Sequence, residues 1–111
     1  MVGTPFPSLE GGTTGTTTSA YVATLSIDMT GYRNCLILIK NSSGANTMFY
    51  KVDSYANTAG TLSNPEVAAT SIGTTATAIV TLDGKTRAKY VVSVIDNSGN
   101  CAYVIEYIKG N

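Results

Sequence analysis

Apolar side chains recur at every second position along much of the chain, and this period restricts the possible folds more than any other feature. Residues 21–29 place five apolar side chains at alternate positions, namely Tyr21, Ala23, Leu25, Ile27 and Met29. Successive side chains of a β-strand point to opposite faces of the sheet, so a period of two predicts a half-buried strand. The chain lacks the 3.6-residue period of an amphipathic helix.

Six further segments are predicted to be strands. Residues 35–39 are a continuous apolar run, typical of a central strand covered on both faces. The others are residues 47–55, 66–71, 74–82, 87–95 and 101–108. Clusters of Asn, Ser and Gly separate several of them, and Asp83-Gly84 favours a type I′ hairpin turn. About seven strands with frequent turns predict an all-β fold, either an antiparallel β-sandwich or a jelly-roll-like arrangement.

The first 19 residues differ from the remainder in composition. They are low in hydrophobicity and rich in Gly, Pro and Thr, so they cannot bury enough apolar surface to fold alone. We therefore expect residues 1–19 to be an extended arm, either flexible or ordered on a neighbouring subunit, and residues 20–111 to be a single β-sandwich domain. Pro5 and Pro7 favour extended backbone around Phe6, which makes Phe6 a candidate anchor.

The residue inventory argues against catalysis. The chain has no histidine, which removes Ser-His-Asp and Cys-His catalysis and His-containing zinc sites. Cys35 and Cys101 fit no zinc spacing and are predicted to be buried thiols, with their pairing left open. The carboxylates that could serve a glycosidase are those a strand surface ordinarily carries, such as Asp28, Asp53, Glu66 and Glu106. We predict a non-enzyme that needs no cofactor and no metal.

Charge and hydropathy limit the partners. Seven basic and seven acidic residues balance, and the basic ones are scattered, so no stripe is available to neutralise phosphates. No apolar run approaches the roughly 18 residues needed to span a bilayer, and the start has no signal-peptide pattern. We expect neither nucleic acid nor membrane as partner, and synthesis in the cytoplasm. Charged residues are only 13% of the chain, so copies meet little electrostatic resistance to association.

Two of the predicted strands carry apolar residues on both faces. Leu36 and Leu38 oppose the face of Cys35, Ile37 and Ile39. Likewise, Tyr103, Ile105 and Tyr107 oppose the face of Ala102, Val104 and Ile108. A small sandwich has one interior, so part of these second faces should be exposed, and exposed apolar patches usually mark interfaces. The predicted partner-binding residues are Phe6, Leu36, Leu38, Tyr103, Ile105 and Tyr107.

The chain resembles small β-sandwich structural proteins of tailed phages and related viruses, including capsid decoration (cement) and fibre-associated proteins. The resemblance lies in residues 32–55, where IKNSSG (39–44) leads into MFYKV (48–52), in the last strand pair over residues 89–108, and in the Gly/Thr-rich start. It implies a structural protein that stabilises a capsid by binding its outer surface, often as a trimer. The implied partners are a second copy and the major capsid protein or another virion protein, and the implied location is the virion.

A carbohydrate-binding or adhesive module is the alternative. Seven tyrosines offer apolar faces with polar edges for stacking on sugars, and the loops at residues 41–46 and 56–65 carry hydrogen-bonding side chains. Four of them lie in strand patterns, however, and tryptophan is absent, so a core or interface role is favoured for Tyr50, Tyr90, Tyr103 and Tyr107.

Overall fold

Eight antiparallel β-strands make up the protein in the computed structural model, which describes residues 8–96 and 100–111. They are β1 (Ser8–Thr16), β2 (Val22–Asp28), β3 (Asn34–Asn41), β4 (Met48–Tyr55), β5 (Ser63–Ile72), β6 (Thr77–Leu82), β7 (Lys89–Asp96) and β8 (Ala102–Gly110). No helix occurs within the described residues. The prediction of an all-β antiparallel sandwich is confirmed.

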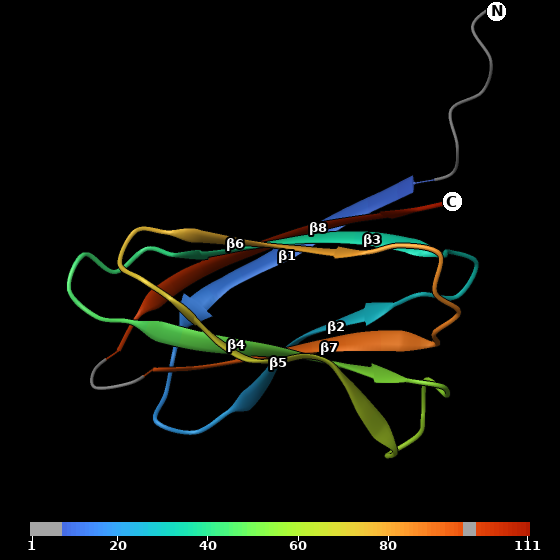
Figure 1. Ribbon diagram of the computed structural model, residues 1–111, viewed down its shortest axis with the longest axis horizontal. Coiled ribbons are helices and arrows are strands. Elements are labelled where there is room, and N and C mark those ends of the chain that lie inside the picture. The colour runs from blue at the N-terminus through green and yellow to red at the C-terminus, as the bar shows by residue number, and fades with distance from the viewer. Residues whose placement is uncertain (1–7, 97–99) are drawn as a thin grey trace, which may run out of the picture.

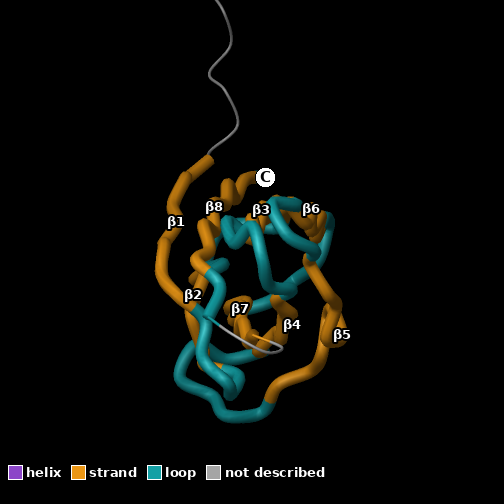
Figure 2. The backbone as a smooth tube through the Cα atoms, turned by 90° about the vertical axis from the view of Figure 1, so that its left-hand side faces the viewer, coloured by secondary structure: helices purple, strands orange, loops and turns teal. Residues whose placement is uncertain are grey.

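The strands form two four-stranded layers. The first sheet has the order β1-β8-β3-β6 and the second has the order β2-β7-β4-β5, and the layers face each other (Figures 1 and 2). The antiparallel pairs are nested, since β1 pairs with β8, β2 with β7, β3 with β6 and β4 with β5. Most connections therefore pass from one layer to the other.

This crossing changes the role of one predicted turn. Asp83-Gly84 was expected to close a hairpin between neighbouring strands, but β6 and β7 belong to different sheets. Gly84 does have the positive φ of 67° that such a turn requires. The chain then continues to Lys89 before the next strand begins, so the turn is one part of a longer crossing segment.

The core lies between the two layers. Its fully buried side chains include Ile37 and Ile39 from β3, Met48 and Val52 from β4, and Tyr90 from β7. In β4, buried and half-buried residues alternate along the whole strand, as a period of two requires.

The strand that is covered on both faces is β7 and not β3. Val91 and Ser93 point away from the core and are nevertheless buried. Their neighbours on β4 are Asp53 and Lys51, whose side chains form an ion pair at 3.9 Å. In β3, by contrast, the residues between the core positions remain exposed. The prediction that residues 35–39 are covered on both sides was wrong.

Strand β1 lies in a segment that was expected to be an arm. Residues 8–16 instead pair with β8 of the same chain over nine consecutive positions, from Ser8 opposite Gly110 to Thr16 opposite Ala102. The sandwich therefore includes these residues, while residues 1–7 lie outside the described part. As a result β1 begins and β8 ends at the same corner of the molecule (Figure 1).

The four edge strands differ in regularity. In the second sheet, the pairing of edge strand β2 shifts register between Ala23 and Leu25. The pairing of edge strand β5 is irregular near Val52, and the strand contains Pro65. In the first sheet, the edge strands β1 and β6 pair in continuous register along their lengths.

Candidate docking surface

The outer side of the first sheet carries a row of apolar side chains. Cross-strand pairing places Leu36 opposite Ile108, and it places Leu38 between Ile79 and Glu106. Leu36, Leu38 and Ile108 are 37–38% exposed, and Ile79 is 69% exposed. We call the surface formed by Leu36, Leu38, Ile79, Val104 and Ile108 the outer apolar face.

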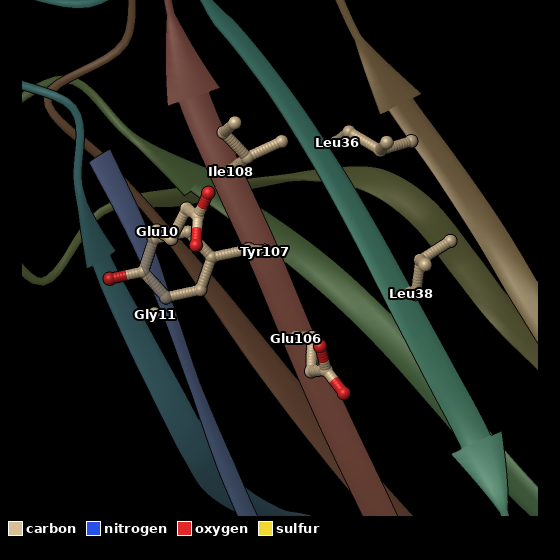
Figure 3. A pocket seen from close by; sticks show the side chains of 7 residues that line it. All are labelled: Glu10, Gly11, Leu36, Leu38, Glu106, Tyr107 and Ile108. Atoms are coloured by element: carbon tan, nitrogen blue, oxygen red, sulfur yellow. The ribbon is translucent and has the colours of Figure 1, made fainter. Parts of the chain in front are cut away.

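Part of this face is a hollow of about 480 Å³. Its lining combines apolar side chains of β3 and β8 with two acids, and consists of Glu10, Gly11, Leu36, Leu38, Glu106, Tyr107 and Ile108 (Figure 3). The three ion pairs among residues 8–96 and 100–111 involve other side chains, so Glu10 and Glu106 keep their charges available. A partner that fits this hollow would be apolar and would present a basic group.

The predicted partner-binding residues fall on two different sides of the sheet. Leu36 and Leu38 lie on the outer apolar face. Ile105 lies in the core with no exposed surface, and Tyr103 and Tyr107 are half-buried against that core, with Tyr107 also lining the hollow. Phe6 lies outside the described residues. For Ile105, a docking role is therefore wrong, because its side chain already fills the space between the layers.

Sequence reasoning missed the residues of β8 that complete the outer face. Val104 and Ile108 were noted as one of two apolar faces, but the opposite face was chosen as the interface. Glu106 lies on the same face of the strand as these two residues, and its charge indicates that this face is exposed to solvent. Lys109 obscured this signal, because it lies on the inner side and is buried. Its ammonium group donates to the Asp28 carbonyl oxygen and lies 4.8 Å from the centre of the Tyr32 ring.

The inward-facing tyrosines of β8 cover the glycines of β1. Tyr107 is paired with Gly11 and Tyr103 with Gly15. A Cβ atom at either glycine would lie 2.5 Å from the tyrosine opposite it, so the rings occupy the space above the glycine backbone. This aromatic cover supplies apolar contact that β1 itself lacks.

The carboxylates that were considered for catalysis are mostly engaged in local structure. Asp28 accepts a hydrogen bond from the Thr30 backbone N–H at 2.9 Å, and Asp53 pairs with Lys51. Glu66 lies 2.7 Å from Arg87 and 3.3 Å from Lys85. Burial raises the pKa of Glu66, but hydrogen bonds from Arg87, Ser54 and Lys85 outweigh burial and hold this pKa below its ordinary value. Glu66 is thus anionic at neutral pH and holds the β6–β7 crossing against β5.

The two cysteines are far apart and inaccessible. Cys35 pairs with Lys109, which lies eight residues beyond Cys101 along the chain. At about 3.3 Å per residue, the two cysteines are separated by roughly 26 Å, whereas a disulfide needs Cα atoms within about 7 Å. Both are buried, and burial raises the pKa of the Cys35 thiol to about 11. These cysteines are not joined to each other, and they do not lie on a surface that could link copies.

Several groups that a sugar-binding site would use are buried. The Asn41 amide donates to the carbonyl oxygens of Asn46 (2.8 Å) and Ile72 (3.0 Å), and its own oxygen accepts from the Ser43 N–H (2.9 Å). Asn41 therefore ties the β3–β4 loop to the end of β5. Tyr50 and Tyr90 belong to the core, as their strand positions predicted.

Two other features are absent from the described residues. No group of three or more His, Cys, Asp or Glu side chains gathers as possible metal ligands in the described parts of the chain. Nor does any helix that could cross a membrane occur in residues 8–96 and 100–111.

No known protein family model matches the sequence, and no curated protein matches it significantly. Solved structures share the fold, and three of them match over most of both chains. A protein of the Bacillus endospore appendages, which form a novel family of disulfide-linked pili, has a TM-score of 0.59 at 9% identity. The match covers 95% of this chain and 88% of that one. The Yersinia pseudotuberculosis-derived mitogen has a TM-score of 0.59 at 13% identity, covering 91% and 86%.

The third structure is YomS, a protein derived from the SPBc2 prophage. Its TM-score is 0.57 at 12% identity, and the match covers 93% of this chain and 96% of YomS. At these identities the likeness establishes a shared small β fold and nothing about activity. The buried, separated cysteines described above also provide no counterpart to the disulfide links named for the Bacillus pili.

Proposed function

We propose that this chain is a non-enzymatic structural protein of a virion, namely a capsid decoration protein that binds the outer surface of the shell through its outer apolar face. The observation that carries this proposal is the exposure of Leu36, Leu38, Ile79 and Ile108 side by side on one sheet. A contiguous apolar patch on a small β domain usually marks a protein interface.

Two features of the fold support the virion setting. The strand order of the two sheets, with its nested pairs, corresponds to the eight-stranded double sheet that recurs in viral capsid and lectin domains. One of the proteins that share the fold comes from a prophage. Because folds host many functions, both points support a class of role and the outer face supplies the site.

The binding free energy expected from the outer apolar face suits a protein that attaches to the shell in many copies. Full burial of a Leu or Ile side chain contributes about 1.5–3 kcal/mol, and these residues still expose a third or more of their surface. Each would add on the order of 1 kcal/mol on docking. Glu10 and Glu106 would select a shell protein with a lysine or arginine opposite the hollow. The major capsid protein is the partner that this proposal names.

The test is co-sedimentation of the chain with shells assembled from the major capsid protein of its own virus. Leu38→Glu should abolish binding, because it places a charge in the centre of the outer apolar face. Leu62→Glu is the matched control, since Leu62 is 88% exposed and lies in the β4–β5 loop. Equal binding by both variants would refute the role of this face. Failure of the unmodified chain to bind, together with a reproducible glycan-array hit, would favour the carbohydrate-binding alternative.

A further inference from the structure

Within residues 8–96 and 100–111, strand β1 leaves a long and regular sheet edge unpaired. Natural sheets usually protect their edges with bulges, prolines or charges. The second sheet has such protection, through the register shift of β2 and through Pro65 and the irregular pairing of β5. Strand β1 runs for nine residues in continuous register, and Glu10 is its only charged residue. It is also longer than β6, the six-residue edge strand on the other side of the same sheet.

The hydrogen bonds identify which backbone groups of β1 are available. The Thr17 N–H donates to the Cys101 carbonyl oxygen at 2.9 Å, so residue 17 faces β8. In an antiparallel ladder, the N–H and C=O of alternate residues point to the same side. Residues 9, 11, 13 and 15 therefore also face β8. The groups of Ser8, Glu10, Gly12, Thr14 and Thr16 point to the free edge.

We propose that a second copy of this chain pairs with this free edge, antiparallel about a two-fold axis at Thr13. In this register Glu10 lies opposite Thr16 of the second copy, and Gly12 lies opposite Thr14. The four pairs would form about eight backbone hydrogen bonds and join the two first sheets into one continuous eight-stranded sheet.

The composition of the edge favours a second copy as the occupant. Identical strands always match in length, and here Glu10 meets a threonine and not another acid. The chain has zero formal net charge, so long-range repulsion between copies is weak. Strands β1 and β2 lie on the same side of the sandwich (Figure 2). Leu9 of β1 and Val22 of β2 are 50% and 51% exposed, although their pairing with Lys109 and Val94 directs them inward. Extension of the sheet would cover part of this apolar surface.

A two-fold contact also differs from the trimer that the resemblance implied. A trimer would need a heterologous contact, for example between β1 of one copy and β6 of the next. Such a contact is limited to the six residues of β6, whereas self-pairing in the proposed register joins residues 10–16 of both copies. This inference stands on the edge geometry and does not require the proposed virion role.

The experiment separates backbone pairing from side-chain effects at one position. Thr14→Pro removes an N–H that points to the free edge and leaves the β1–β8 hydrogen bonds in place. Thr14→Ala keeps the N–H and serves as the matched control. In light scattering coupled to size exclusion, we expect a dimer for the unmodified chain and for Thr14→Ala, and a monomer for Thr14→Pro with the same circular dichroism spectrum.

Amide hydrogen exchange on the unmodified chain gives a second readout that does not depend on the folding of a variant. The amides of Gly12, Thr14 and Thr16 should gain at least tenfold protection as concentration rises through the dimer transition. Those of Gly11, Thr13 and Gly15 should be protected at every concentration, because they face β8. A monomer at all concentrations, a trimer, or new protection in β6 and not in β1 would overturn the proposal.

Discussion

Gly11 and Gly15 show how a strand with few apolar side chains is held in the sandwich. Each glycine leaves room for a tyrosine ring from β8, so the contact that a side chain of β1 would make is made by its neighbour. A glycine in a strand interior ordinarily weakens the strand. Here the cost is offset by the burial of Tyr103 and Tyr107 against both the core and the backbone of β1.

Gly11→Ala should therefore lower the free energy of unfolding by about 1–3 kcal/mol, because the new methyl group would overlap the Tyr107 ring. Urea denaturation followed by tyrosine fluorescence measures the change. Gly44→Ala is the control and should stay within about 0.5 kcal/mol, since a Cβ there meets nothing within 4 Å. In a Tyr107→Ala background the effect of Gly11→Ala should largely disappear. If it persists, the ring is not its cause.

At the level of single residues, the sequence predicted core positions well in strands where only one of the two faces is apolar. Ile27, Met48, Tyr50 and Val52 are examples, and all four are buried. In β8 both parities are apolar, and the prediction chose the wrong one for Ile105. The outcome depends on which residues of β1 and β3 lie beside β8, and this pairing is a long-range property that a local period does not contain.

At the level of elements, β1 was the strand that the sequence concealed. Its own residues are small and polar, so its apolar content matched that of an unfolded arm. The contacts that fix it belong to residues nearly 100 positions away in β8. The remaining strands were located within a few residues, because their periods and flanking turns are local. The assignment of these strands to the two sheets could not be predicted, because consecutive strands mostly lie in different layers.

The crossing between β6 and β7 is fixed by an ion pair cluster, which gives the stability a defined pH dependence. The pKa of Glu66 is lower in the folded protein than in the unfolded chain. The unfolded state therefore binds more protons, and the stabilisation is present above the ordinary pKa of about 4.5 and is lost as the pH falls through the folded value.

Glu66→Gln should accordingly cost about 1–2 kcal/mol at pH 7, because two cations lose their buried partner. The difference from the unmodified chain should shrink as the pH falls below the ordinary pKa of about 4.5 and Glu66 takes up a proton. Chemical denaturation of both proteins between pH 3 and pH 7 measures this difference in unfolding free energy. Asp53→Asn, which removes the longer and more exposed pair with Lys51, should have little effect at any pH. A constant difference for Glu66→Gln across this range would contradict the assignment.

At the level of the whole molecule, the charge balance and the open edge act together. Zero formal net charge removes the repulsion that often keeps small domains apart, and backbone hydrogen bonding at an edge needs no charged groups. Association through β1 should then respond weakly to ionic strength, in contrast to docking through the acidic hollow, which salt would weaken.

We expect the dimer dissociation constant to change less than about threefold between 50 and 500 mM NaCl, as measured by sedimentation equilibrium. Thr14→Lys provides the informative comparison, because its ammonium groups would be diagonal neighbours on the same face of the joined sheet. That variant should dimerise poorly at low salt and recover partly at high salt. A strong salt dependence of the unmodified chain would indicate an interface built on ion pairs.

Ser8 pairs with Gly110, so the start of β1 and the end of β8 lie side by side. The same sandwich could therefore form from a circularly permuted chain. Partners in an antiparallel ladder lie about 5 Å apart, so a linker of a few residues could join these two positions without moving either strand. New ends could then be placed in an exposed loop such as the one between β4 and β5. For the same reason, two proteins fused before β1 and after β8 would both extend from one corner of the sandwich. The domain could then display the two proteins on the same side.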